Sequence, residues 1–229
     1  MTIIQDIKPI GMHSAYVEGL PFDRAKKALE KKRYRVISLE ESALLRMQHG
    51  KGSFVSIYGN WTREAFVYDP EKRLLCLTKS SPIMKSPRKA TQAHREGNEY
   101  PLGNEYFLTN VQFQGALEDS VEVSSMEIPT NRFGEDGLTA YAFGDAAENY
   151  GLFLRGTGIK LMPIHLPDLK DEPKDESFAR QVWFGYLRYF SGRSSLLSGR
   201  SSLYGYSRSL ANGGRLRGVR KNFSTGTKG

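Results

Sequence analysis

The last quarter of the chain contains no acidic residue, and this asymmetry limits what that part of the sequence can form. All 25 Asp and Glu residues of the 229-residue chain lie at or before Glu176, together with 23 Lys and Arg residues. The ten remaining Lys and Arg residues follow Glu176, so the net charge of +8 belongs to the C-terminal segment. Such an imbalance is typical of a basic appendage that contacts a polyanion. A tail that only solubilises the protein, or that packs on an acidic partner, would have the same composition.

From Ser191 onward the composition also stops supporting a hydrophobic core. Residues 191–229 are rich in Ser, Gly and Arg, and the seven-residue pattern of residues 191–197 returns in 198–204. A segment with so little apolar surface cannot offset its ordering entropy. We therefore expect a disordered basic tail over 191–229. Residues 213–218 resemble in composition the Arg/Gly-rich tails of RNA-associated proteins.

The chemistry of this tail suits nucleic acid. Arginine offers planar, bidentate donors to phosphate, and tyrosine rings stack on bases with little sequence preference. The predicted nucleic-acid-binding set, for RNA rather than DNA, is Arg193, Arg200, Tyr204, Tyr206, Arg208, Arg215, Arg217, Arg220 and Lys221. An anionic membrane surface is the competing polyanion, but the sequence has no lipidation motif.

The remainder, residues 1–190, predicts one α+β domain with a mainly antiparallel sheet and several short helices. Capping boxes that begin at Ser38 and Thr109 mark two helix starts. Short turns separate stretches that predict strands, among them 53–58, 61–68, 73–78 and 138–143. The apolar residues of 177–190 follow a helical spacing, which predicts a last helix that packs on the core or binds a partner protein.

A second functional hypothesis is an enzyme that acts on an anionic small molecule. Three polar loops, 58–63, 78–81 and 129–136, carry cations and hydrogen-bonding groups that could surround an anion. The candidate residues are Asn60, Trp61, Arg63, Lys79, His94, Asn131 and Arg132, with Trp61 as a wall and His94 as an acid or base. The same residues are also common in ordinary turns and on solvated surfaces. The sequence therefore leaves open whether the protein is an enzyme.

Other classes of site find little support in the sequence. The four histidines are widely separated and Cys76 is the single cysteine, so we expect neither a metal site nor a cofactor. Cys76 lies in an apolar run, which is typical of a small buried hydrophobic residue. No 18-residue apolar run and no secretory signal is present, and we expect a cytoplasmic protein. A third hypothesis is an adaptor that docks a partner through the helix predicted over 177–190 and the tail.

Overall fold

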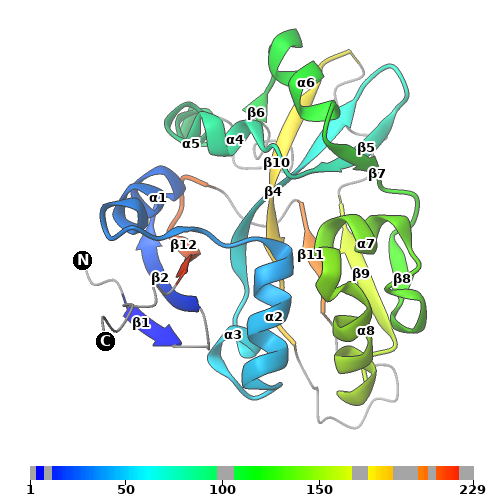
Figure 1. Ribbon diagram of the computed structural model, residues 1–229. Helices are drawn as coiled ribbons and strands as arrows, with labels where there is room; N and C mark the ends of the chain where they lie inside the picture. The colour runs from blue at the N-terminus through cyan, green and yellow to red at the C-terminus, as the bar shows by residue number, and fades with distance from the viewer. Residues whose placement is uncertain are drawn as a thin grey trace, which may run out of the picture.

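The computed structural model describes residues 4–7, 12–96, 106–166, 175–187, 201–205 and 210–221. These residues form a single α+β domain built on one mainly antiparallel sheet, as the sequence predicts (Figure 1). The strand order along the sheet is β1-β2-β12-β4-β10-β11-β9-β8. Only the β12–β4 and β11–β9 pairs are parallel among the described strands. The strands of this path are β1 (Ile4–Ile7), β2 (Met12–Leu20), β4 (Asn60–Asp69), β8 (Glu127–Pro129), β9 (Leu161–His165), β10 (Phe178–Phe184), β11 (Leu203–Tyr204) and β12 (Gly214–Lys221).

Four short strands pair with members of this path, or with one another, without belonging to the path. They are β3 (Arg35–Val36), which pairs with β12, β5 (Leu74–Thr78), which pairs with β4, β6 (Tyr106–Phe107), which pairs with β10, and β7 (Ser120–Glu122), which pairs with β5. The antiparallel β4–β5 pairing confirms that a short turn joins the strands predicted over 61–68 and 73–78. Asp69 supports this turn because its Oδ1 accepts hydrogen bonds from the backbone N–H groups of Glu71 and Lys72.

Helices surround the sheet in two groups, and each group covers its own part of the core. One group lies with β9 and β10 against a core that includes Phe66, Phe143, Tyr150 and Phe184. The other lies with β2, β4 and β12 against a core that includes Phe22, Trp61 and Trp183. Figure 1 shows the first group from the lower centre to the lower right and the second from the left to the top of the molecule. The first comprises α2 (Leu39–His49), α7 (Gly137–Phe143) and α8 (Ala147–Gly156), and the second α1 (Phe22–Lys31), α4 (Pro82–Lys85), α5 (Pro87–Glu96) and α6 (Asn110–Leu117).

Two helix starts follow the local chemistry that the sequence indicates. At the start of α2 the Ser38 hydroxyl accepts from the Glu41 backbone N–H, and the Glu41 carboxylate accepts from the Ser38 backbone N–H. Thr109 and Gln112 repeat this arrangement at the start of α6. Each box satisfies donors that the first helical turn leaves free. Both capping-box predictions are confirmed.

The helix predicted over 177–190 is wrong, because residues 178–184 form the strand β10 in the middle of the sheet. Every side chain of β10 is buried, including those of Arg180 and Gln181. A strand that is buried on both faces carries apolar residues without alternation, so its pattern overlaps with that of a helix. The protein-partner helix proposed for this segment is therefore not present in the described residues.

The tail prediction is wrong for the part of residues 191–229 that the structure describes. Strand β12 pairs with β2 over its whole length and also contacts β4, and β11 pairs with β10 and β9. Leu203, Leu216 and Val219 are fully buried. The few apolar residues of this basic segment thus face the core, while long-range strand pairing supplies the hydrogen bonds. The other residues of 191–229 lie outside the described residues.

Two further strand predictions are wrong. Residues 138–143 belong to the helix α7, whose start is capped by the Asp136 carboxylate, which accepts from the Thr139 backbone N–H at 2.9 Å. Residues 54–57 form the short helix α3 (Phe54–Ile57). The cap residue Asp136 precedes an apolar run that could equally be a strand, and packing against α2 and α8 selects the helix.

Candidate functional site

The residues predicted to surround an anion lie in different parts of the molecule. Asn60 and Trp61 are buried at the start of β4, each with 1% of its surface exposed. Trp61 packs edge-on against Phe22 and Trp183, with ring centroids 5.6 and 5.4 Å away. Trp61 is thus a core residue and cannot be the wall of an open pocket. Its interpretation as a ligand contact was wrong.

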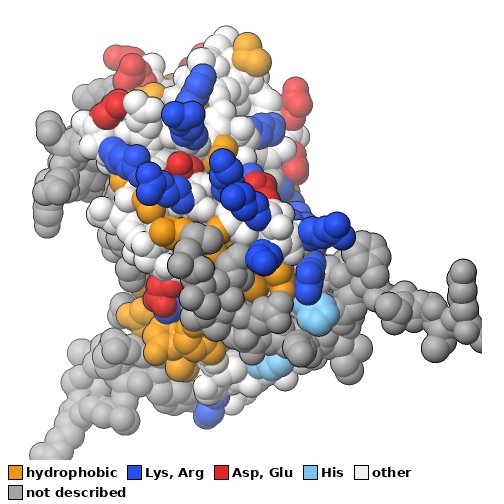
Figure 2. Space-filling model, turned by 90° about the vertical axis from the view of Figure 1, so that its left-hand side faces the viewer, with side chains coloured by type: hydrophobic (Ala, Val, Ile, Leu, Met, Phe, Trp, Pro, Cys, Tyr) orange, Lys and Arg blue, Asp and Glu red, His pale blue; other side chains and the backbone are white. Residues whose placement is uncertain are grey.

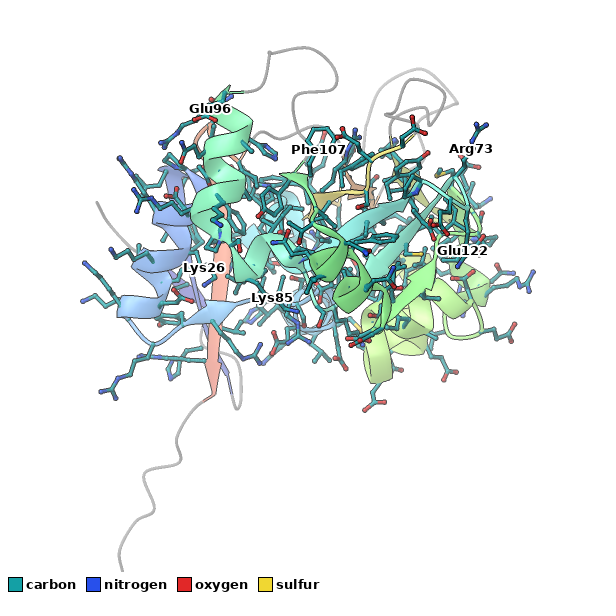
Figure 3. The ribbon with its side chains drawn as sticks, turned by 90° about the horizontal axis from the view of Figure 1, so that it is seen from above. Lys26, Arg73, Lys85, Glu96, Phe107 and Glu122 are labelled. Carbon is teal, nitrogen blue, oxygen red and sulfur yellow. The ribbon has the colours of Figure 1, made fainter. Side chains whose placement is uncertain are left out.

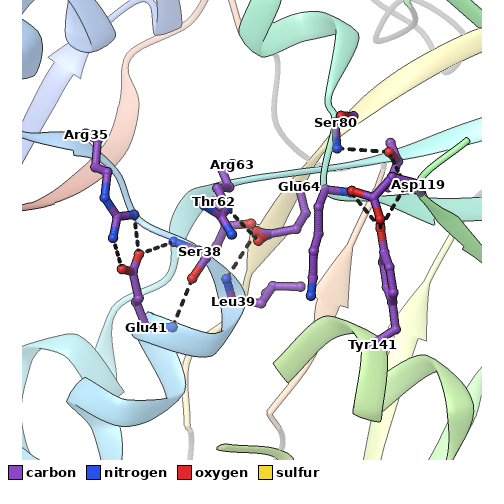
Figure 4. A network of polar contacts seen from close by, with 12 residues as sticks. Arg35, Ser38, Leu39, Glu41, Thr62, Arg63, Glu64, Ser80, Asp119 and Tyr141 are labelled. Carbon is purple, nitrogen blue, oxygen red and sulfur yellow. Dashed lines mark hydrogen bonds and ion pairs between the residues drawn. The ribbon is translucent and has the colours of Figure 1, made fainter. Parts of the chain in front are cut away.

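Arg63 and Lys79 belong to a polar network between α2, β4, β5 and α7 (Figure 4). The Arg63 Nε lies 3.4 Å from the Glu64 Oε1, and the other carboxylate oxygen, Oε2, accepts from the Leu39 backbone N–H at 3.1 Å. Burial raises the pKa of the Glu64 carboxyl. The Lys79 ammonium lies 4.6 Å from the centre of the Tyr141 ring. These contacts hold secondary-structure elements together.

His94 is buried on α5 and does not act as a surface acid or base. Its Nδ1 accepts a hydrogen bond from the Leu210 backbone N–H at 3.1 Å, which ties α5 to the chain that leads into β12. Burial and the nearby charge of Arg180 lower the pKa of His94 to about 4. The imidazole is therefore neutral at physiological pH.

Asn131 and Arg132 are exposed in a short 3-10 helix, η1 (Thr130–Arg132), which packs against α8. Figure 1 places β8, which leads into η1, on the opposite side of the molecule from α5 and His94. The structure therefore does not bring these predicted anion ligands together.

The tail cations that the structure describes are used inside the fold. Arg217 has 1% of its surface exposed and donates through Nη1 to the Ser14 hydroxyl at 2.8 Å. The Arg220 guanidinium lies 4.8 Å from the centre of the Tyr34 ring. Arg217 is therefore unavailable to a phosphate, and its interpretation as a nucleic-acid contact was wrong. Tyr204 stacks on His165 with ring centroids 4.5 Å apart. The structure describes no side chain for the rest of the predicted set, which is Arg193, Arg200, Tyr206, Arg208 and Lys221.

A different pocket, which the sequence did not indicate, is centred on Arg215. Its volume is about 350 Å³, and we call it the Arg215 pocket. It lies where β10 ends, where β12 begins and where α3 turns into β4. Its lining comprises Glu18, Ile57, Tyr58, Gly59, Trp183, Tyr186, Gly213, Gly214 and Arg215.

Aromatic rings and one ion pair fix Arg215 in this pocket. Its guanidinium lies 4.4 Å from the centre of the Tyr58 ring and 4.8 Å from that of Phe54, and it pairs with the Glu18 carboxylate across the β2–β12 ladder. Tyr58 and Phe54 are themselves 4.4 Å apart. A guanidinium held over aromatic faces keeps its charge and loses rotamer freedom before a ligand arrives. The pocket therefore presents a pre-organised cation beside exposed rings.

Two glycines make room for the pocket's tryptophan wall. A Cβ at Gly59 would lie 2.4 Å from the Trp183 Nε1, and a Cβ at Gly214 would lie 2.1 Å from the Trp61 ring. Both positions therefore require glycine so that the backbone can approach the rings. The edge-on contact of Trp61 with Trp183 supports this wall from the core.

Arg46 and Tyr150 hold two residues, Gly185 and Ser201, that lie 16 positions apart along the chain. Arg46 is fully buried and donates through Nη2 to the Gly185 carbonyl oxygen at 2.5 Å and through Nη1 to the Tyr150 hydroxyl at 3.2 Å. The Tyr150 hydroxyl in turn lies 3.1 Å from the Ser201 hydroxyl. The Gly185 backbone N–H donates to the Ser202 carbonyl oxygen at 2.7 Å. Residues 185 and 201 are thus held at one place in the core.

Sequence reasoning missed this pocket because its parts are far apart along the chain. Arg215 was assigned to a disordered tail and Trp183 to a helix, while Tyr58 was noted only as a loop residue. The available signal was the pairing of glycines with aromatic residues, as at Tyr58 and Gly59. Only strand pairing brings these positions to one place.

The described residues were also compared with the requirements of a metal site and of a membrane-spanning helix. No group of three or more His, Cys, Asp or Glu side chains there could hold a metal ion. Within the same residues, every helix is too short or too polar to cross a membrane. Cys76, the free cysteine, is buried in β5 with a raised thiol pKa caused mainly by burial.

Comparison with known proteins identifies the fold. No protein-family model and no curated protein matches the sequence. A solved structure described as "Accommodation of massive sequence variation in Nanoarchaeota by the C-type lectin fold" is similar to this chain with a TM-score of 0.61. The similarity covers 91% of this chain and 97% of that chain, at 16% sequence identity. The protein therefore has a C-type lectin-like fold.

Proposed function

We propose that this protein is a recognition protein that binds a partner protein through the Arg215 pocket and through segment 185–213, of which Tyr186 and Gly213 line the pocket. The observation that carries the proposal is the position of this segment. Trp183 and Tyr186 line the pocket where the chain leaves β10, and Gly213 and Gly214 line it where the chain enters β12. A binding surface framed by one segment and supported by a rigid sheet is a common arrangement for recognition.

The composition of this segment supports the proposal. Ser, Gly, Tyr and Arg make up most of residues 185–213. The recognition loops of antibodies favour the same residue types, since tyrosine supplies contact area and Ser and Gly adapt to the ligand, with Arg at positions of high binding energy. The repeated Ser/Gly/Arg pattern, which first suggests disorder, is equally suited to contacting a partner.

The pocket itself has the residue types that dominate protein interfaces. Tyr58 and Tyr186 expose 43% and 36% of their surface, and Ile57 exposes 44%. Aromatic residues and arginine carry most of the binding energy in such interfaces. A volume of about 350 Å³ accommodates one protruding side chain or a short turn of a partner.

The structural neighbour supports the same interpretation. That protein is described as accommodating massive sequence variation by its C-type lectin fold. We infer that this chain likewise uses the fold as a scaffold on which the residues of 185–213 vary. Closely related copies of the chain should then differ mainly at exposed positions of this segment and around Tyr58.

An unbiased selection tests the proposal. Peptides from a displayed random library would be selected on the immobilised full chain, and their affinities measured for three variants. We expect Tyr58→Ala and Tyr186→Ala each to weaken binding roughly tenfold or more, since removing a central aromatic contact costs at least about 1.4 kcal/mol. Phe107→Ala removes an equally exposed ring from β6, outside the pocket, and should change nothing.

Two results would contradict the proposal. Selected peptides that bind all three variants as tightly as the unchanged protein would place the binding surface elsewhere. The protein could instead bind glycans on an array. If Tyr186→Ala abolished that binding and no peptide was selected, the pocket would recognise carbohydrate instead of protein.

A further inference from the structure

The face formed by α1 and α5 carries a concentration of positive charge that the Arg215 pocket does not use. Figure 2 shows Lys and Arg side chains gathered on the upper part of this face, with Asp and Glu side chains scattered among them. A groove of about 690 Å³ runs between the two helices. Its lining contains five cations against two carboxylates, namely Arg24, Lys26, Lys27, Arg88 and Arg95 against Asp23 and Glu30, with Pro87 and Gln92 between them.

Most of these cations have no neutralising partner. Lys26 pairs with Glu30 at 2.5 Å. Among the described residues no carboxylate lies within ion-pair distance of Arg24, Lys27, Arg88 or Arg95, and all four side chains are exposed. We call these four residues the groove cations. They leave a local excess of positive charge that a bound anion would neutralise.

The walls of the groove are fixed by packing rather than by these charges. Ala25, Ala28 and Leu29 of α1 and Ala90 of α5 are buried on the inner faces of the helices. The Asp23 backbone N–H donates to the Thr91 hydroxyl across the two helices at 3.3 Å. Figure 3 shows the two helices side by side, with Lys26 on α1 near α5. The spacing of the cations is therefore set by the fold before any ligand binds.

The cations in the first turn of α5 give no benefit to the helix itself. Its first turn contains Arg88 and Lys89 and no acidic residue. Cations near the positive end of a helix dipole reduce helix stability by a few tenths of a kcal/mol each. These first-turn cations destabilise the helix when no ligand is bound, and they become favourable when a negatively charged ligand lies in the groove.

We propose that this groove binds the phosphate backbone of double-stranded nucleic acid. The groove lining contains no aromatic side chain, so stacking on the bases of a single strand contributes nothing. No large exposed hydrophobic side chain of the described residues lies on α1 or α5, so the face lacks the apolar groups that insert into a membrane. A duplex carries phosphates at high density along its axis, so the cations of both helices can contact phosphates at the same time.

This site differs from the tail-based interaction that the sequence predicts. Arg217 of the tail is buried, and Arg215 is paired with Glu18, whereas the groove cations are exposed and unpaired among the described residues. Contacts to phosphates alone carry little sequence information. The groove should therefore bind DNA and RNA duplexes of the same length with similar affinity.

The number of groove cations predicts how strongly the affinity for a duplex depends on salt concentration. Four phosphates neutralised on a duplex predict a slope of about −3.6 for log affinity against log salt. Between about 50 and 200 mM salt the full chain should then lose affinity by roughly 150-fold. A chain without the groove cations should bind weakly at low salt and lose only a few-fold over the same range.

The experiment uses fluorescence anisotropy with a labelled DNA duplex and a labelled RNA duplex, at several salt concentrations. The groove variant carries Arg24→Gln, Lys27→Gln, Arg88→Gln and Arg95→Gln. A matched control variant removes four exposed cations elsewhere, with Lys51→Gln, Arg132→Gln, Arg155→Gln and Lys160→Gln, and so has the same net charge. Glutamine keeps the helix propensity close to that of Lys and Arg, and thermal melting of each variant verifies its fold.

Loss of affinity and of salt slope in the groove variant alone would support the proposal. Equal losses in the groove and control variants would overturn it, because net charge alone would then explain binding. A third variant with Arg193→Gln, Arg200→Gln and Arg208→Gln tests the contribution of the tail cations. A loss of affinity in this variant alone would also overturn the proposal. So would displacement of the duplex by polyglutamate at equal charge concentration, which would indicate an acidic protein as the ligand.

Discussion

Replacing Trp61 by alanine should destabilise the protein strongly, although the residue lies next to a predicted turn. Trp61 has 1% of its surface exposed and makes edge-on contacts with the Phe22 and Trp183 rings. Truncating a buried tryptophan to alanine costs about 3–5 kcal/mol, because both transfer free energy and packing are lost. For a chain of this size, about 4 kcal/mol corresponds to a decrease in Tm of roughly 12 °C.

The control for this prediction is Trp61→Phe. A phenyl ring keeps part of the contact with Trp183 and removes the indole N–H, which is buried without a hydrogen-bond partner among the described residues. We expect a smaller loss than for Trp61→Ala, because the phenyl ring leaves a smaller cavity and fewer lost contacts. Far-UV circular dichroism during heating measures both variants. A Tm for Trp61→Ala within about 2 °C of the unchanged protein, below the shift that 1 kcal/mol gives, would refute the core assignment.

Three further predictions concern single positions. Gly214→Ala should destabilise by about 1–3 kcal/mol because its Cβ would clash with the Trp61 ring, whereas Gly115→Ala, with open space in α6, should stabilise by about 0.5–1 kcal/mol in urea denaturation. The pKa of His94 is lowered to about 4 in the folded protein. Below pH ~6.5 the imidazole therefore binds a proton in the unfolded chain but stays neutral in the folded chain until about pH 4. Stability should thus be full above pH ~6.5 and fall by up to about 1.4 kcal/mol per pH unit towards pH 4, and a flat profile in His94→Gln would verify the origin. Glu64→Gln should change stability by less than about 1 kcal/mol at neutral pH, since the amide still accepts from the Leu39 N–H while the desolvation cost disappears; a large loss would show that the charge itself stabilises the fold.

Local chemistry determined which elements the sequence could predict. The capping boxes at Ser38 and Thr109 act within one helical turn, and the turn at Asp69 acts within three residues, so each can be read from neighbouring positions. Strand β10 could not be predicted because it is buried on both faces and therefore lacks alternation. Strand β12 could not be predicted because its partners, β2 and β4, lie more than 140 residues away.

The same limit applies to the sites. The predicted anion pocket was assembled from polar loops, and loop composition alone does not show which loops meet. Trp61 and His94 are taken into the core by tertiary packing, which overrides their local sequence context. The groove forms only where α5 lies beside α1, a proximity that the local sequence of neither helix shows.

The anchoring of Gly185 and Ser201 by Arg46 and Tyr150 separates the domain's stability from the length of the chain between them. The closure entropy of a chain with fixed ends grows only with the logarithm of its length. One more copy of the seven-residue pattern between these two points would raise that cost by about 0.3 kcal/mol, provided that the added residues make no contacts of their own. Copies could therefore gain repeats between the two anchors, or lose the repeat at 191–197, while the sheet stays intact. Such a design lets a binding surface change in size as well as in sequence.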